Sequence, residues 1–341
     1  MHGFTLKSVT RRFRRETPVT PRLTNVLHLY QTLTVVDPAT IKRNGRVFRL
    51  FIRSAGNIRC SNVTRLMATQ FQAELKSAGK AKATVKSYCA AVSSVFGWAV
   101  ENIDGVTSNP FEGVKAPKLN KSEPKYFTRE EMDRLYRAVE AMDWHNPIQR
   151  LQWLALLRVG DTCGFRIGEI LNLRWDDIDL DGRRIMVRYR PHMPGECWEW
   201  GTKGHRDRAM PINNDDLVAL LYRMKEVCPW RYPFLKARRC LYLQAHSGEL
   251  TDWVRKRPYT NLYVIWKRIR TLAQVKGNGA FHQVRRTAAT EFGEHLTASQ
   301  LQRAFGWQEL STAQHYLATR DSYQMEAVAK AQAARTSGPD R

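Results

Sequence analysis

The sequence predicts a mostly α-helical (α+β) protein with two domains, the second of which carries a small antiparallel sheet. A chain of 341 residues is too long for one ordinary domain and long enough to bury two cores. Residues 116–125 contain two prolines and no apolar periodicity, which is typical of an extended linker. Apolar residues recur at helical spacing on both sides of this linker, whereas strand-like alternation is found at 183–190 and 208–212.

The first domain, residues 25–115, is predicted to be helical. Helical patterns cover about 39–54, 62–77 and 83–101, and Pro110 ends the helical run. The last pattern places six apolar residues on one face: Val85, Tyr88, Val92, Val95, Phe96 and Ala99. Residues 1–24 form a basic extension that is too short for a further folded domain.

In the second domain, residues 126–322, local signals predict helices and then a hairpin. Thr128 and Glu131 form a capping box that opens a helix to about Met142, and an apolar helix is expected over 148–159. Residues 183–190 and 208–212 are predicted to be hairpin strands, with Gly201-Thr-Lys203-Gly204 as the tight turn. A tail, residues 323–341, follows with a helix expected over 325–334.

The charge of the chain predicts a polyanionic partner. Lys and Arg number 55 against 32 Asp and Glu, so the formal net charge is +23. Residues 1–60 hold twelve Lys or Arg and only two acidic residues, Glu16 and Asp37. Such an excess gives affinity for phosphate backbones, although charge alone fits RNA or an anionic membrane surface as well as DNA.

The cysteines and the apolar runs exclude several other classes of protein. Six cysteines without a Cys-x-x-Cys pair argue against a zinc ribbon or a disulfide framework and favour a reducing, cytoplasmic compartment. No His-Glu-x-x-His motif supports a metal, so neither a metal nor a cofactor is expected. The longest uncharged run, residues 87–100, is too short for a membrane span. The basic start, residues 1–15, lacks an apolar signal core and is expected to contact DNA.

Short motifs in the second domain supply the groups that phosphodiester exchange needs. Gly164-Phe-Arg166 is followed three residues later by Glu169, which on a helix would lie one turn along the same face as Arg166. His282-x-x-Arg285, Gly306-Trp307 and Ser311-Thr-Ala-Gln-His-Tyr316 follow in order. Arginine forks grip phosphate oxygens, an imidazole moves protons, an indole N–H donates a hydrogen bond and a phenol can attack phosphorus.

Taken singly, these residues also have structural interpretations. An Arg–Glu pair one turn apart is usually a surface ion pair, and a lysine at a hairpin tip is usually solvated. Trp307 also fits a core position, and Tyr316 has a rival phenol in Tyr323, while His315 is expected to be a bystander. His282-x-x-Arg285 competes with a second match, His205-x-x-Arg208, and is preferred because the Gly-Trp and Tyr motifs follow it.

The order and spacing of the motifs resemble the tyrosine recombinases, the phage integrase family. The resemblance covers roughly residues 20–335, and it includes Gly-x-Arg-x-x-Glu-x-x-x-Leu-x-Trp-x-Asp from Gly164 to Asp177. Trp307 stands where many members carry His. The resemblance implies one role for each motif residue: Arg166 and Arg285 as catalytic arginines, Glu169 as accessory carboxylate, Lys203 as general acid, His282 as hydrogen-bond or proton donor, Trp307 as phosphate donor and Tyr316 as nucleophile.

The resemblance further implies a site-specific recombinase or integrase of a phage or mobile element. Such an enzyme cleaves and rejoins DNA strands through a covalent 3′-phosphotyrosine, without metal or ATP. Residues 25–115 would be the core-binding domain, 126–322 the catalytic domain, and 323–341 a contact with a neighbouring protomer. The expected partners are double-stranded DNA recombination sites, bound by a homotetramer on two sites that passes through a Holliday junction, together with accessory DNA-bending proteins.

Two alternatives stay open at this point. A type IB topoisomerase or a hairpin-forming telomere resolvase uses the same set of groups but relaxes or seals one duplex. A non-catalytic DNA-binding protein on a decayed recombinase scaffold would keep the fold and lose the chemistry. Trapping a covalent adduct on nicked DNA excludes the non-catalytic protein, and strand transfer between two sites excludes a simple topoisomerase.

Overall fold

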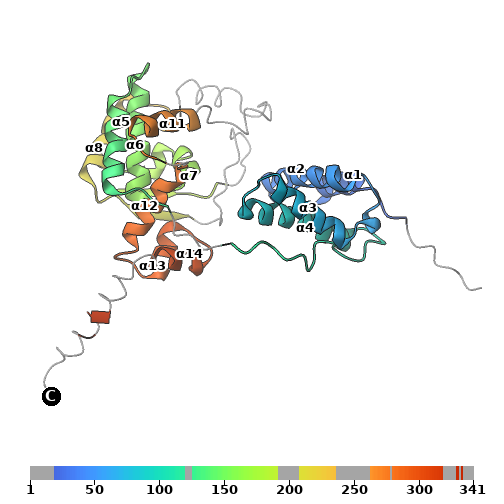
Figure 1. Cartoon of the computed structure of the whole chain (residues 1–341). Helices are drawn as coiled ribbons and strands as arrows, with labels where there is room; N and C mark the ends of the chain where they lie inside the picture. Colours follow the sequence, from blue (N-terminus) through green and yellow to red (C-terminus); the bar gives the residue numbers. More distant parts are fainter. Residues whose placement is uncertain are drawn as a thin grey trace, which may run out of the picture. The chain divides into compact units, whose positions relative to one another are not determined.

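The structure, a computed structural model, describes residues 19–119, 125–190, 207–235, 262–276, 279–317, 328–329 and 332. The chain divides between Ser122 and Glu123 into two compact units, each with its own core. Both units are mainly helical, and the second contains a small antiparallel sheet, which confirms the predicted fold class (Figure 1). Among the described residues, no helix is long and apolar enough to cross a membrane.

The described part of the first unit consists of four α-helices and one 3-10 turn. They are α1 (Leu23–Leu33), α2 (Pro38–Ala55), η1 (Cys60–Asn62), α3 (Arg65–Ser77) and α4 (Lys82–Asn102). Asp37 caps α2 by accepting hydrogen bonds from the backbone N–H groups of Ala39 and Thr40, at 2.9 and 3.2 Å. Helix α3 begins three residues later than predicted, because Thr64 caps it and the preceding residues form η1.

A cluster of phenylalanine rings forms the centre of this first core. Its rings come from α2, α3, α4 and the segment after α4, with centroids of contacting pairs 5.3–6.4 Å apart: Phe48, Phe51, Phe71, Phe96 and Phe111. Edge-to-face aromatic pairs at such distances add to the stabilisation from burial alone. The cluster therefore fixes α2, α3 and α4 against one another.

The second unit contains the remaining helices and the sheet. Its described elements are α5 (Arg129–Ala141), α6 (Pro147–Cys163), α7 (Ile167–Leu171), η2 (Trp175–Asp177), β1 (Ile178–Asp179), β2 (Arg184–Val187), β3 (Arg208–Pro211), α8 (Asp215–Val227), α11 (Leu262–Leu272), α12 (His282–Phe292), α13 (Ala298–Phe305) and α14 (Leu310–Leu317). The strands lie in the order β1-β2-β3, all antiparallel, with Ile185 opposite Met210.

Several local predictions for this unit are confirmed, and some boundaries shift. Thr128 and Glu131 form the predicted capping box of α5. Helix α6 is four residues longer than predicted at its end and stops at Gly164, whose φ of 61° is left-handed. The hairpin strands are shorter than predicted, whereas the predicted turn residues Gly201 to Gly204, including Lys203, lie outside the described residues.

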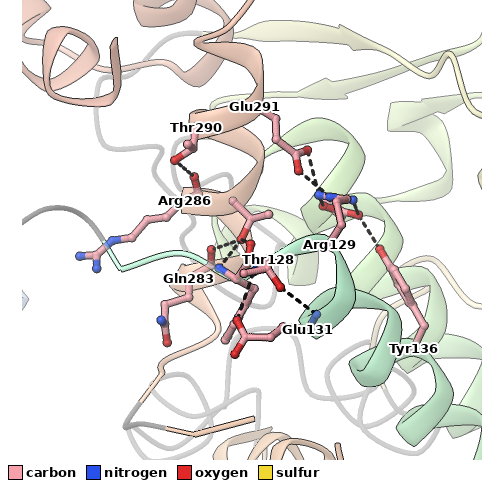
Figure 2. A network of polar contacts seen from close by, with 11 residues as sticks. Thr128, Arg129, Glu131, Tyr136, Gln283, Arg286, Thr290 and Glu291 are labelled. Atoms are coloured by element: carbon pink, nitrogen blue, oxygen red, sulfur yellow. Dashed lines mark hydrogen bonds and ion pairs between the residues drawn. The ribbon is translucent and has the colours of Figure 1, made fainter. Parts of the chain in front are cut away.

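Helix α12 is held in place by polar contacts with α5 and α6 (Figure 2). The Arg129 guanidinium bridges Asp161 at 2.7 Å and Glu291 at 2.5 Å, and the Tyr136 hydroxyl donates to Asp161 at 2.7 Å. Close packing adds to this, because a Cβ at Gly160 of α6 would lie 3.0 Å from a methyl group of Val284. These contacts fix the helix that carries His282 and Arg285.

Candidate active site

Arg166 is positioned by the glycine turn between α6 and α7. Gly164 ends α6 in a left-handed conformation, and a Cβ there would collide with the Phe305 ring at 2.4 Å. Two residues later Arg166 caps α7, and its backbone N–H donates to the Glu169 carboxylate at 2.7 Å. The glycine therefore lets the chain turn and lets Phe305 approach, as the sequence motif predicts for an arginine at a helix start.

Glu169 is a buried carboxylate saturated with donors. Its side chain is 3% exposed, and Oε1 accepts from Arg166 Nη1 at 2.8 Å. The Arg208 fork donates to both oxygens, Nη1 to Oε1 at 3.2 Å and Nη2 to Oε2 at 2.5 Å, and Arg285 Nη1 lies 3.8 Å from Oε2. Burial alone would raise the pKa of Glu169, but the charge and hydrogen bonds of Arg208, the charge of Arg285 and the Arg166 N–H together lower it.

Arg285, on the first turn of α12, is 2% exposed and fixed by backbone carbonyls. It donates to the carbonyl oxygens of Gly164 and Phe305, both at 2.7 Å, and lies over the rings of Phe305 and Trp307 at 5.0 and 5.5 Å. Burial first, and then the neighbouring charge of Arg166, lower its pKa to about 9. Arg285 is therefore still a cation at neutral pH.

The charges of this cluster do not balance. Three guanidiniums, those of Arg166, Arg208 and Arg285, contact one carboxylate, that of Glu169. Among these four described side chains, two positive charges are thus in excess, where burial weakens solvent screening. A site of this kind favours an anion, and planar arginine forks match the oxygens of a phosphate group.

Tyr316 reaches the same cluster through a stack of aromatic rings. The ring centroids of Phe305 and Trp307 are 4.9 Å apart, and those of Trp307 and Tyr316 are 5.1 Å apart with the planes only 4° from parallel. Trp307 follows α13 and is half-buried, so it lies in neither an apolar helix nor a full core position. Burial raises the pKa of Tyr316, and the opposing charges of Arg286 and Arg285 only reduce that rise, so the phenol is protonated at neutral pH.

The other predicted residues differ in what the structure describes. His282 is the first residue of α12, one turn before Arg285, and is exposed. His315 is also exposed and meets the Tyr316 ring edge-on at 6.2 Å. The structure thus brings together Arg166, Glu169, Arg285, Trp307 and Tyr316. Lys203 lies outside the described residues, as does Tyr323.

Sequence reasoning missed two arginines beside these groups. Arg208 appears in the sequence only as part of a second His-x-x-Arg match, yet it contacts Glu169 directly. A signal was present: Met210 and Ile212 are buried, and residues two apart share one face of a strand, so Arg208 faces the interior. Arg286 acts on the charge state of Tyr316, and its guanidinium extends away from the network of Figure 2.

In the described parts of the chain, no group of three His, Cys, Asp or Glu side chains is arranged to hold a metal ion. The described groups that favour an anion are the guanidiniums of Arg166, Arg208 and Arg285. The residues that come together belong to several elements: Glu169 to α7, Arg208 to β3, Arg285 to α12, Trp307 to the segment before α14, and Tyr316 to α14 itself.

Comparison with known proteins identifies the family to which the chain belongs. Residues 125–322, more than half of the chain, match the phage integrase family, and the chain belongs to that family. It is 27% identical over 303 residues to tyrosine recombinase XerC of Oceanobacillus iheyensis, covering 86% of this chain and 90% of the relative. It is 26% identical over 294 residues to tyrosine recombinase XerA of Thermococcus kodakarensis, covering 84% and 87%.

Solved structures show the same fold. A lambda integrase dimer bound to a COC′ core site has a TM-score of 0.62 at 18% identity, covering 88% of this chain and 78% of that one. The Tn1549 transposon integrase in complex with transposon right end DNA has a TM-score of 0.68 at 14% identity, covering 92% and 99%. The predicted family is confirmed, and the roles of the individual residues remain predictions.

Proposed function

We propose that this chain is a site-specific DNA recombinase that cleaves and rejoins strands through a covalent 3′-phosphotyrosine, without metal or ATP. The observation that carries the proposal is the excess of two positive charges among Arg166, Arg208, Arg285 and Glu169, one aromatic ring away from Tyr316. This arrangement places a phosphate-binding cluster beside a phenol. Membership of the phage integrase family supports the same reaction class.

In the proposed reaction the Tyr316 oxygen attacks the phosphorus, and the bond from phosphorus to the 5′ oxygen breaks. The Tyr316 proton passes to solvent, and the departing 5′ oxygen takes a proton from the Lys203 ammonium, which is left as a neutral amine. The phosphate stays on the 3′ oxygen, now linked to the tyrosine. The 5′ hydroxyl of a second strand reverses these steps and rejoins the DNA, and His282 assists by donating a hydrogen bond or moving a proton.

Arg166 and Arg285 act on the non-bridging oxygens in this proposal. A guanidinium has five N–H groups, and two of those on Arg285 are held by the carbonyls of Gly164 and Phe305. These bonds orient the plane of the fork before DNA binds. Donors fixed in advance stabilise a transition state more than donors that must reorganise.

The first unit supports duplex DNA as the partner. Lys42, Arg46, Arg49 and Arg53 are exposed on α2 at spacings of four, three and four residues, which puts them on one face. A basic stripe of this kind neutralises backbone phosphates without reading sequence. We assign residues 25–115 to core binding and 126–322 to catalysis.

The proposed assembly follows the relatives. One lambda integrase structure is a dimer on a core site, and another is a tetramer bound to a Holliday junction. We extend this arrangement to a homotetramer of this chain on two recombination sites, with residues 323–341 contacting a neighbour and DNA-bending proteins assisting. Coupled isologous or cyclic contacts of this type make assembly cooperative.

The test uses nicked suicide duplexes tiled across the DNA that flanks the gene for this chain. Cleavage at such a nick releases a short fragment, so the covalent adduct accumulates and is seen on a denaturing gel. Mass spectrometry of the adduct should map the phosphate to Tyr316. Adduct formation excludes a non-catalytic DNA-binding protein, and transfer of the cleaved strand to a second site excludes a simple type IB topoisomerase. DNA binding without any adduct would contradict the proposal.

Lysine in place of either arginine is expected to slow cleavage by on the order of 10²-fold, as the loss of an oxyanion donor does in other enzymes. Arg166→Lys and Arg285→Lys keep the charge but lose the planar fork. Single-turnover cleavage should fall while Kd for the same duplex stays within about twofold, because the loss is confined to the transition state. Equal losses in binding and cleavage would mean that these residues only hold DNA.

Trp307 is expected to act through its indole N–H. Trp307→His keeps an N–H donor, whereas Trp307→Phe keeps a ring to stack on Tyr316 but has no donor. The histidine variant should therefore cleave about 10-fold faster than the phenylalanine variant, the value of one hydrogen bond to a charged group. Single-turnover rates on one duplex make the comparison. A faster phenylalanine variant would show that stacking explains the residue.

A further inference from the structure

We propose that Arg208 is a positioning residue that orients the Glu169 carboxylate and, through it, the guanidiniums of Arg166 and Arg285. The inference rests on the proposed function, because it requires Arg166 and Arg285 to bind the reacting phosphate. Arg208 lies outside the set of residues predicted from the motifs. It belongs to β3, whereas its partner Glu169 belongs to α7.

The first observation is the geometry of the Arg208–Glu169 pair. Both terminal nitrogens of Arg208 face the carboxylate, one on each oxygen, at 3.2 and 2.5 Å. The two side chains are 11% and 3% exposed. A two-point, buried contact fixes the rotation of the carboxylate as well as its position, which a single hydrogen bond cannot do.

The second observation is that Arg208 also packs against two other segments of the site. Its guanidinium lies over the Phe165 ring at 5.2 Å. It also fills the space beside Gly306, where a Cβ would lie 2.9 Å from Arg208 Nη1 and where φ is +62°. Arg208 therefore touches the loop that leads to Arg166 and the turn that leads to Trp307. A displacement of the Arg208 guanidinium would therefore also shift both segments.

The third observation is the burial of Glu169. A carboxylate that is 3% exposed cannot replace lost donors with water. If Arg208 is removed, the charged groups left in contact with Glu169 among the described residues are Arg166 and Arg285. We expect the carboxylate to turn toward them, which would draw both forks away from the phosphate. Arg208 thus leaves those two forks available for substrate.

A competing explanation is that Arg208 only anchors β3 and hence the segment that contains Lys203, five residues earlier. A substrate with sulfur at the 5′ bridging position separates the two explanations, because a thiolate leaves without a proton donor. If Arg208 acts through the arginines, sulfur does not restore cleavage to its variants. If it acts through Lys203, sulfur does restore it.

The experiment measures single-turnover cleavage, Kd and melting temperature of the full chain on a duplex that gives the wild-type adduct. Arg208→Met removes the charge and keeps the length, Arg208→Lys keeps the charge with one donor point, and Arg184→Met is the matched control. Arg184 lies on neighbouring β2, pairs with Asp179 at 2.9 Å and is 58% exposed. Arg208→Met should cleave about 10- to 100-fold more slowly with unchanged Kd, Arg208→Lys should fall between, and the control should match wild type.

A double-mutant cycle with Glu169→Gln adds a readout that a merely structural residue would not move. If Arg208 acts through Glu169, the second substitution should add little to the first. The cleavage rate of the double variant should then lie within about twofold of that of the slower single variant. The inference would be overturned if the rate losses of the two single variants multiplied in the double variant. It would also be overturned if Arg208→Met cleaved at the wild-type rate, or if the sulfur substrate restored its cleavage. If Arg208→Met fails to fold, Arg208→Lys decides, and a wild-type rate there overturns it. A wild-type chain that binds DNA but forms no adduct defeats the proposed function, whereas a wild-type adduct with unaffected Arg208 variants defeats only this inference.

Discussion

Tyr316→Phe is expected to bind its recombination site with wild-type affinity and to form no covalent complex. The substitution removes one hydroxyl and keeps the ring that stacks on Trp307 at 5.1 Å, so the fold and the aromatic stack should be preserved. A covalent catalyst that loses its nucleophile typically slows by on the order of 10⁶-fold, which places the adduct below detection. A gel-shift assay for binding and a denaturing gel for the adduct, on the same nicked duplex, make the measurement.

Tyr323→Phe is the matched control, since Tyr323 is the other phenol close in sequence to the Tyr motif. This control should form the adduct at the wild-type rate. An adduct with Tyr316→Phe that disappears with Tyr323→Phe would show that the nucleophile is misassigned.

Elements of the fold with local signals were predictable from sequence. The capping box of α5 acts over a few residues, so the sequence alone contains the whole interaction. The end of α6 was predicted four residues too early, although Gly164, which ends the helix in a left-handed conformation, is an equally local signal. Helix α1 was missed because Arg22, its N-cap, makes no side-chain capping hydrogen bond and no acidic residue lies in its first turn. Its position depends on tertiary contacts instead, since Leu23, Val26, Leu27 and Tyr30 are all buried in the first core.

Contacts within the candidate site were predictable where the two residues share a short motif, and were not predictable where they lie far apart in the sequence. Arg166 and Glu169 are one turn apart, so their pairing follows from helical spacing. Arg208 and Glu169 are 39 residues apart in the sequence, and Arg129 and Glu291 are 162 apart. No local sequence pattern therefore predicts either pair. Both depend on how β3, α7, α5 and α12 pack, which is a property of the whole core.

Arg208 illustrates the difference between a motif and a position. As part of His205-x-x-Arg208 it looked like a chance match, because that motif is short. As the first residue of the predicted strand 208–212 it alternates with Met210 and Ile212, both of which are buried, so it points inward. A buried arginine needs an anionic partner, and Glu169 is that partner. Strand periodicity combined with the cost of burying charge would have identified it.

Lys203→Ala is expected to slow cleavage of ordinary DNA by about 10²- to 10⁴-fold, the contribution of a well-placed general acid. The residue itself lies outside the described part of the chain, but the strands on either side of it are paired, Val187 opposite Arg208. The Tyr189 backbone N–H also donates to Asp207 at 2.7 Å. The described ends of the connection that contains Lys203 therefore meet beside Arg208.

The decisive measurement repeats this cleavage on a duplex with sulfur at the 5′ bridging position. A thiol has a much lower pKa than an alcohol, so the 5′ thiolate leaves without being protonated. Lys203→Ala should then recover to near the wild-type rate. Arg285→Ala should stay slow on both substrates, because its fork acts on non-bridging oxygens that the sulfur does not change. Rescue of a His282 variant but not of Lys203→Ala would assign the proton donor to the histidine, since only the group that protonates the leaving oxygen becomes dispensable when that proton is no longer needed.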